Sequence, residues 1–345
     1  MHIAVAGLAL GGLLAGGAFF ALQVARPAGG TSADSFAAHA PETARDGLVQ
    51  PATVTPTPPL PTPTPVPLPV QHCYGPRLGT GGFPLRPADA DSVFSNCQVI
   101  AYYGYPPVPG LGVLGQFPTA GEMVAALQKE AARFDAVNGP RGVALAIHLI
   151  ADVAQASPGP DGSYVARAPA SLINAYIALA QEHDLLVILD LQLGHASLDS
   201  EFAAVEPYLL NPRVHLALDP EWVTPGAPGT TIGSIDASEI THAQELLSNL
   251  VLTHHLPRKM LIVHRFTEGM ITNAQDLGTI PGVDLVIDID GFGYAAAKTS
   301  EYQAFVHDMG APHGGMKLFY HQDVDLMTPQ QVEALDPQPD VVIFQ

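Results

Sequence analysis

The feature that most constrains this chain is a regular alternation, from residue 98 to the last residue, between short apolar runs and longer amphipathic stretches. The runs predict eight strands, at 98–105, 143–152, 185–193, 214–219, 260–266, 284–290, 316–321 and 340–345. Helical patterns separate them at 119–136, 169–183, 199–209, 236–255, 298–309 and 328–335, with a weaker one at 268–277. Capping residues such as Thr119 and Asp236 precede two of these helices. Strands that alternate with helices indicate βα units and a parallel sheet.

Eight strands in about 250 residues, most of them followed by a helix, are typical of a (β/α)₈ barrel. An open doubly wound sheet is the alternative, and it needs a glycine-rich phosphate turn after an early strand. The turn at 103–115, YGYPPVPGLGVLG, contains three prolines and does not match GxGxxG. We therefore predict an α/β fold, a single TIM-type barrel over residues 72–345.

The residues before this barrel have a different composition. Residues 3–24 carry no charged side chain, and about 20 such residues can cross a bilayer as a helix. They begin almost at the initiator methionine, so we predict a signal peptide or signal anchor over 1–25. Residues 51–70 contain nine prolines and five threonines. Because proline fixes φ and lacks an N–H donor, we predict that 26–71 is a disordered, extended Pro/Thr-rich linker.

The charge balance restricts the partners. The chain has 33 acidic and 14 basic residues, a formal net charge of −19. Nucleic-acid binding needs clustered Lys and Arg, so we predict no nucleic-acid partner. Anionic lipid is disfavoured for the same reason, which leaves the N-terminal apolar segment as the membrane contact. We predict an extracellular or cell-surface protein, membrane-anchored or secreted. In such a compartment Cys73 and Cys97 can form a disulfide, with free thiols as the alternative.

The carboxyl end of the fourth predicted strand carries two carboxyl groups. In a barrel, polar residues at such ends form the functional site. Asp219 and Glu221 are two residues apart and so share a strand face. Hydrolysis of a glycosidic bond uses two carboxyl groups, one protonated and one ionised. Trp222, the single tryptophan, offers a flat face for a sugar ring. The alternative makes Asp219 a loop cap and Glu221 a surface charge.

This Asp-Pro-Glu-Trp segment resembles the D-x-E motif that ends strand four in chitinase-like barrel glycoside hydrolases. The longer acidic run of that family is absent, since His215 and Ala217 occupy the earlier positions on the same face. The leader, Pro/Thr-rich stretch and barrel together also resemble uncharacterised secreted bacterial barrel proteins. These resemblances imply a carbohydrate polymer as substrate.

Polar residues recur at the ends of the other strands. Asp288 and Asp290 share a face of the sixth strand and are candidates for a base or nucleophile, or for ligands of a hard cation. Asp190 and Gln192 form a similar pair on the third strand. The remaining substrate-binding candidates at strand ends are Tyr102, His148, Trp222, His264 and Tyr320. Crowded carboxylates raise the pKa of some members, so that one remains a proton donor at neutral pH.

The sequence therefore predicts an exported, cell-surface glycoside hydrolase. Glu221 is the expected general acid, Asp288 or Asp290 the base or nucleophile, and Asp219 and Asp190 the groups that tune their pKa values. Tyr102, Trp222 and Tyr320 are expected to line sugar subsites.

Three other functional classes are alternatives to a glycoside hydrolase. A serine hydrolase is disfavoured because G-x-S-x-G is missing. A non-catalytic module that binds glycan or protein in the same cleft is one alternative. The other is a metal-dependent hydrolase or deacetylase, with His148, Asp152, His264 and Asp288 converging on one ion. Clustered motifs such as HExxH are missing, so we predict no metal and no cofactor.

Overall fold

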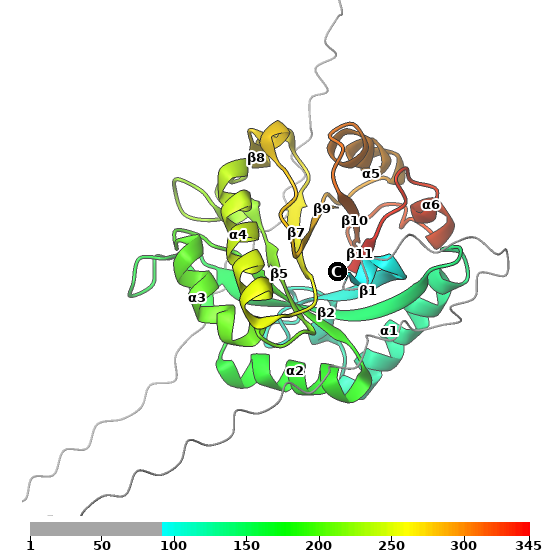
Figure 1. Cartoon of the computed structure of the whole chain (residues 1–345), viewed down its shortest axis with the longest axis horizontal. Coiled ribbons are helices and arrows are strands. Elements are labelled where there is room, and N and C mark those ends of the chain that lie inside the picture. Colours follow the sequence, from blue (N-terminus) through cyan, green and yellow to red (C-terminus); the bar gives the residue numbers. More distant parts are fainter. Residues whose placement is uncertain (1–91) are drawn as a thin grey trace, which may run out of the picture. The chain divides into compact units, whose positions relative to one another are not determined.

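The computed structural model of the protein describes residues 92–345, which form a closed parallel barrel (Figure 1). The order around the barrel is β1-β2-β4-β5-β7-β9-β10-β11, and pairing of β1 with β11 closes it. The eight barrel strands are β1 Cys97–Gly104, β2 Gly142–Ala154, β4 Leu186–Leu191, β5 Val214–Leu218, β7 Lys259–Arg265, β9 Val283–Ile289, β10 His313–Leu318 and β11 Val341–Phe344. The predicted (β/α)₈ fold class is confirmed.

Six α-helices lie between the strands of residues 92–345. They are α1 Ala120–Asp135, α2 Ala170–His183, α3 Leu198–Leu209, α4 Ala237–His254, α5 Ala295–Tyr302 and α6 Pro329–Glu333. The two with predicted capping residues, α1 and α4, begin directly after Thr119 and Asp236, whereas α5 begins three residues before its predicted start. The Thr119 hydroxyl accepts from the Glu122 N–H at the start of α1, and the Asp236 carboxylate caps α4. A five-residue π-helical turn, Gln303–His307, extends α5.

The helix predicted at 268–277 is wrong. Two short 3-10 turns, Glu268–Met270 and Ala274–Asp276, occupy this stretch, with β8 (Ile271–Thr272) between them. Strand β8 pairs with β6 (Ile235–Asp236) outside the barrel. Asn273 lies in the left-handed region at φ 54°, which a continuous right-handed helix does not tolerate.

Residues that alternate along the strands fill two separate apolar regions. Side chains such as Leu145, Ile147 and Leu149 point outward and pack beneath the helices. Ala144, Ala146 and their counterparts on other strands, among them Ala217, Ile262 and Val286, point inward and fill the barrel. Both faces of each strand are therefore buried, as is usual for parallel sheets. The apolar filling forms a floor beneath the polar side chains described below.

The seventh barrel strand starts three residues earlier than predicted. We predicted 316–321, whereas β10 runs over His313–Leu318 and includes Gly314 and Gly315. A Cβ on Gly315 would lie 2.6 Å from Asp288 Oδ1, so glycine is what allows β10 to approach β9 here. With these bounds Lys317 is a buried residue of β10, and Tyr320 lies beyond the end of the strand.

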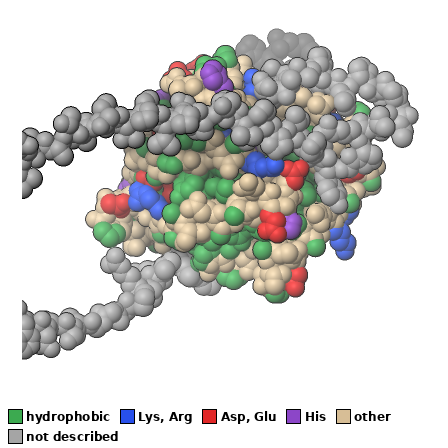
Figure 2. All heavy atoms as spheres, turned by 60° about the horizontal axis from the view of Figure 1, so that its bottom comes forward, with side chains coloured by type: hydrophobic (Ala, Val, Ile, Leu, Met, Phe, Trp, Pro, Cys, Tyr) green, Lys and Arg blue, Asp and Glu red, His purple; other side chains and the backbone are tan. Residues whose placement is uncertain are grey.

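A short strand, β3 (Val165–Arg167), pairs antiparallel with the last residues of β2, Asp152 to Ala154. The face shown in Figure 2 carries hydrophobic side chains grouped near its centre and well-separated Lys and Arg side chains around them. Within residues 92–345, none of the helices combines the length and the apolar character needed to cross a membrane. The predicted leader at 1–25, the linker at 26–71 and Cys73 of the predicted disulfide lie outside the described residues.

Candidate functional site

The carboxyl half of the barrel interior holds a layer of ionisable side chains. His148, Asp190, His264 and Asp288 come from β2, β4, β7 and β9, and each has an exposed fraction of 0%. Lys317 of β10 joins them with 2% exposed. The backbone brings His264 opposite Asp288, and Asp288 opposite Gly315, in the strand register. Burying so many charged groups is unfavourable unless they pair with one another or with a ligand.

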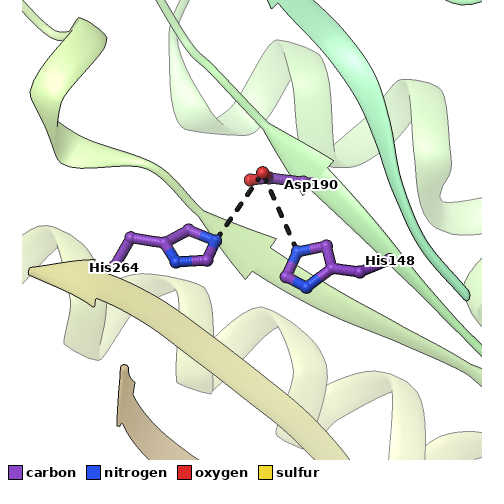
Figure 3. A group of neighbouring side chains, drawn as sticks. All are labelled: His148, Asp190 and His264. Atoms are coloured by element: carbon purple, nitrogen blue, oxygen red, sulfur yellow. Dashed lines mark ion pairs between the residues drawn. The ribbon is translucent and has the colours of Figure 1, made fainter. Parts of the chain in front are cut away.

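Two histidines face one carboxylate at the centre of this layer (Figure 3). The Oδ2 atom of Asp190 lies 3.8 Å from Nε2 of His148 and 3.7 Å from Nε2 of His264. The two imidazole rings stack with centroids 5.3 Å apart. Burial lowers the pKa of His148 well below the ordinary imidazole value, despite the nearby Asp190. Burial acts to raise the pKa of Asp190, but interaction with His264 outweighs it and lowers that pKa to about 2.

The other side of His264 faces two more carboxylates. Its Nδ1 lies 2.9 Å from Asp288 Oδ2 and 3.5 Å from Asp290 Oδ2. Burial and Lys317 oppose protonation of His264, yet Asp290, Asp190 and Asp288 together raise its pKa well above the ordinary value. Asp290 in turn receives the Lys317 ammonium, whose Nζ lies 3.0 and 3.1 Å from its two carboxylate oxygens. Burial raises the pKa of Asp290, and Lys317 and His264 oppose that rise.

Tyr103 connects these groups. Its ring packs edge-on against His148, with centroids 5.0 Å apart, and Lys317 Nζ lies 3.6 Å from its centroid on the ring face. Gln192 donates from Nε2 to the Tyr103 hydroxyl at 3.3 Å, and its Oε1 accepts from the Ala154 N–H. Gln192 therefore contacts the inward-facing Tyr103 beside this layer.

Asp219, Glu221 and Trp222 form the mouth above the layer. Asp219 is 3% exposed and accepts a 2.8 Å hydrogen bond from the Trp222 indole, whereas Glu221 and Trp222 remain half-buried. Burial, with further effects of Asp190 and Asp290, raises the pKa of Asp219 to about 7. Burial, followed by Asp219 and Asp290, raises the pKa of Glu221 well above the usual carboxyl range. Glu221 thus places a carboxyl with a raised pKa at the opening of the barrel.

Three residues considered from the sequence do not join this cluster. Tyr102 points outward, where it stacks on Phe117 at a centroid distance of 5.7 Å. Tyr320 follows β10, stacks on Phe344 and lies 3.5 Å from the Tyr102 hydroxyl. These two tyrosines, predicted to line sugar subsites, therefore lie outside the inward-facing cluster.

Asp152 is displaced because β2 contains a register shift between Ile150 and Asp152. Its carboxyl interacts with Glu201 of α3, and burial together with Glu201 raises its pKa to about 8. Glu201 is itself held by Arg167 through two contacts of 2.6 and 2.7 Å. The set of His148, Asp152, His264 and Asp288 therefore does not converge, and Asp190 replaces Asp152 between the histidines.

Two site residues were missed. Tyr103 lies beside the chosen Tyr102, and alternation along a strand means that only one of them can face inward. Lys317 lies in the middle of an apolar run after two glycines. A lysine inside such a run indicates a buried, paired charge, and this pattern could have predicted Lys317 as a site residue.

No family model matches this chain, and no curated protein matches it. Among solved structures, it is similar to oxaloacetate acetylhydrolase in complex with the product oxalate, with 12% identity, 72% of this chain and 75% of that chain covered, and a TM-score of 0.39. The cellulose synthase subunit Z of Clostridioides difficile shares 8% identity over 72% and 91% of the chains, with a TM-score of 0.40. A broad-specificity endoglucanase of glycoside hydrolase family 5 from an uncultured bacterium shares 10% identity over 79% and 86%, with a TM-score of 0.37. Likenesses of this degree bear on neither the activity nor the substrate.

Proposed function

We propose that the barrel is a glycoside hydrolase in which Glu221 is the general acid. The observation that carries this proposal is the position of the Glu221 carboxyl, half-buried at the barrel mouth with a pKa well above the usual range. A general acid must hold its proton at working pH and must reach the leaving oxygen of the substrate. Burial and the neighbouring Asp219 and Asp290 favour the first property, and the partial exposure of Glu221 favours the second.

Asp290 is the second carboxyl group, acting as nucleophile or base. It is 8% exposed, whereas Asp288 is fully buried and accepts a hydrogen bond from His264. The Lys317 ammonium contacts both oxygens of Asp290 and favours its ionised form. Asp288 then acts through His264 as a positioning residue. The sequence allowed either Asp288 or Asp290 as base or nucleophile, and the proposal assigns this role to Asp290.

Asp219 adds to the effect of burial in raising the pKa of Glu221, and it also fixes the turn on which Glu221 lies. Its carboxyl accepts from the Trp222 indole, which holds the 3-10 turn Pro220–Trp222 on which Glu221 lies. The N–H of Gly233 donates to the Glu221 carbonyl at 2.7 Å, so the following loop closes back on the same turn. A fixed backbone is what a general acid needs if its proton is to meet one oxygen of the substrate.

The substrate class is a neutral glycan. Phe292 and Tyr294 follow β9, at the same end of the barrel as Asp290, and are 65% and 60% exposed. Exposed aromatic rings beside a site offer flat apolar faces to sugar rings. The formal charge of −19 disfavours anionic polymers. Together with Trp222, these rings, rather than Tyr102 and Tyr320, line the sugar subsites. The apolar segment at 3–24 supports a location at the cell surface.

The test is release of reducing ends from a panel of storage and cell-wall glycans by the full chain and its variants. Glu221→Gln should lower kcat by roughly 10²–10⁴-fold, the range of a general acid. The same variant should keep most of its activity on aryl glycosides with an acidic phenol, because that leaving group departs without a proton. Glu206→Gln on the exposed face of α3 is the matched control and should keep full activity.

The outcomes separate the alternatives. Activity that survives in Glu221→Gln but vanishes in Asp290→Asn would move the acid to β9. Release from no glycan, with retained binding to one of them, would favour the non-catalytic module. Normal activity in both variants would contradict the proposal.

A further inference from the structure

Three potential ligand atoms meet in the barrel interior with no hydrogen-bond partner among the described residues. One nitrogen each of His148 and His264 and one carboxylate oxygen of Asp190 all lie within 4.8 Å of one another. Both nitrogens of His148, both oxygens of Asp190 and Nε2 of His264 are buried and make no hydrogen bond within residues 92–345. Buried polar atoms are nearly always hydrogen-bonded, so a group of them aimed at one point calls for an occupant.

From this cluster we infer a binding site for a first-row divalent transition metal such as Zn²⁺. Two imidazoles and one carboxylate are a ligand set that Zn²⁺ takes in catalytic sites, with a fourth position open. Zinc–ligand distances of about 2.0–2.2 Å place tetrahedral ligands about 3.3–3.6 Å apart. The 3.7 and 3.8 Å separations of Asp190 Oδ2 from the two Nε2 atoms need to close by only a few tenths of an ångström.

Contacts behind His264 hold its ring in the orientation that a metal ligand needs. Its Nδ1 and Asp288 Oδ2 are 2.9 Å apart, so Nδ1 is the donor and Nε2 presents its lone pair to the cluster. A carboxylate behind a histidine is the usual support of a metal-binding imidazole, because it holds the tautomer and the ring orientation. Tyr103 packs edge-on against both histidine rings, with centroid distances of 5.0 and 6.0 Å.

The surrounding charges suit a divalent cation. Asp190, Asp288 and Asp290 supply three carboxylates, and Lys317 offsets one of them through its pair with Asp290. With both histidines neutral, the cluster has two negative charges left, which a divalent ion balances. The alternative to a metal ion is a protonated His264. Its two N–H groups would then face Asp190 and Asp288 without any metal.

The experiment uses the full chain without a histidine tag, treated with a chelator and then titrated with Co²⁺. The expected result is one equivalent of Co²⁺, with visible d–d absorption of a site with nitrogen and oxygen ligands. Zn²⁺ should displace it, and Mg²⁺, which prefers oxygen ligands, should not. At a Zn²⁺ concentration of about 100 times Kd, the melting temperature should rise by roughly 5–10 °C.

The variants separate this site from surface histidines. Asp190→Asn and His148→Gln should abolish the Co²⁺ spectrum. His215→Gln is the matched control, since His215 is also buried in the barrel but accepts the Met260 N–H at 3.0 Å on β7. This control should bind Co²⁺ like the parent.

Failure of the parent chain to take up Co²⁺ or Zn²⁺ would overturn the inference and favour the protonated His264. Uptake that is unchanged in folded Asp190→Asn would overturn it as well. If the variants do not fold, the parent chain still tests the inference. Binding of one equivalent of Co²⁺ in preference to Mg²⁺ supports the site, and any other stoichiometry or preference contradicts it. No glycan is present in this experiment, so its outcome is independent of the proposed hydrolase activity.

Discussion

The two ends of the barrel both bury charged side chains but treat them differently. At the amino end, Lys259 donates to the carbonyls of Asn211 and Val214, at 2.7 and 2.8 Å, and Arg141 pairs with Asp340 at 2.6 Å. At the carboxyl end, His148 and Asp190 have no hydrogen-bond partner among the described residues. The first arrangement ties strands together, whereas the second leaves binding capacity for a ligand. In a (β/α)₈ barrel, this is the difference between a stabilising end and a functional end.

Strand β9 contains the same contrast within seven residues. Asp284, near its start, accepts from Ser92 and Arg258, both at 2.7 Å. Asp288 lies four residues further along on the same face and contacts His264 instead. Identical side chains on one strand face therefore serve stability at one end and the site at the other. The following predictions test this division, from the largest expected effect to the smallest.

Arg141→Met should destabilise the protein without changing the site. It removes the arginine from a buried ion pair with Asp340 and should cost about 3–5 kcal/mol of unfolding free energy. Denaturant unfolding measures the loss. Arg133→Met is the control, since its 2.6 Å pair with Glu130 is on the surface and should contribute at most about 1 kcal/mol. Equal losses in the two variants would contradict the division.

The buried Lys259 should make stability depend on alkaline pH. Burial lowers the pKa of Lys259 from 10.5 to about 7. Between these values the unfolded chain binds a proton that the folded chain does not, so stability rises with pH by at most about 1.4 kcal/mol per unit. Unfolding measured from pH 7 to 10.5 should show this rise in the parent and a flatter profile in Lys259→Met. Parallel profiles would show that Lys259 stays charged when buried.

Asp288→Asn should weaken metal binding by about 10–100-fold, because it removes the charge behind His264. The change is measured by competition between Co²⁺ and a chelating dye. Asp284→Asn on the same strand face is the control, and it should lower stability while leaving metal affinity unchanged. A loss of affinity in the control as large as in Asp288→Asn would remove the distinction between the two ends.

The smallest effect is expected at the rim. Phe292→Ala should raise KM for a polymeric glycan by about 2- to 10-fold, with kcat nearly constant, because one aromatic contact is worth about 0.5–1.5 kcal/mol. Leu252→Ala is the comparison, since Leu252 is equally exposed, at 61%, but lies in the last turn of α4. If both variants raise KM to the same extent, Phe292 does not contribute specifically to glycan binding.

Much of the fold was accessible from the sequence because it depends on local periodicity. All eight barrel strands were predicted, and seven of the eight begin within one residue of their observed start. The exception is β10, whose two glycines hid its start. Asp190, His264, Asp288 and Asp290 were singled out because each charge ends or interrupts an apolar run. Such interruptions are costly in a core, so they mark positions with a partner or a function.

The sequence by itself determined that this chain forms a parallel barrel with ionisable groups at the carboxyl ends of its strands. Only the tertiary structure decided which of those groups meet. Where both strand faces are buried, polarity does not reveal the inward face, and a shift of one residue reverses it. Thus Tyr103 rather than Tyr102 faces the site, and the irregularity in β2 sends Asp152 to Glu201. Lys317 enters because glycine lets β10 approach Asp288, a contact between chain segments that no local pattern contains.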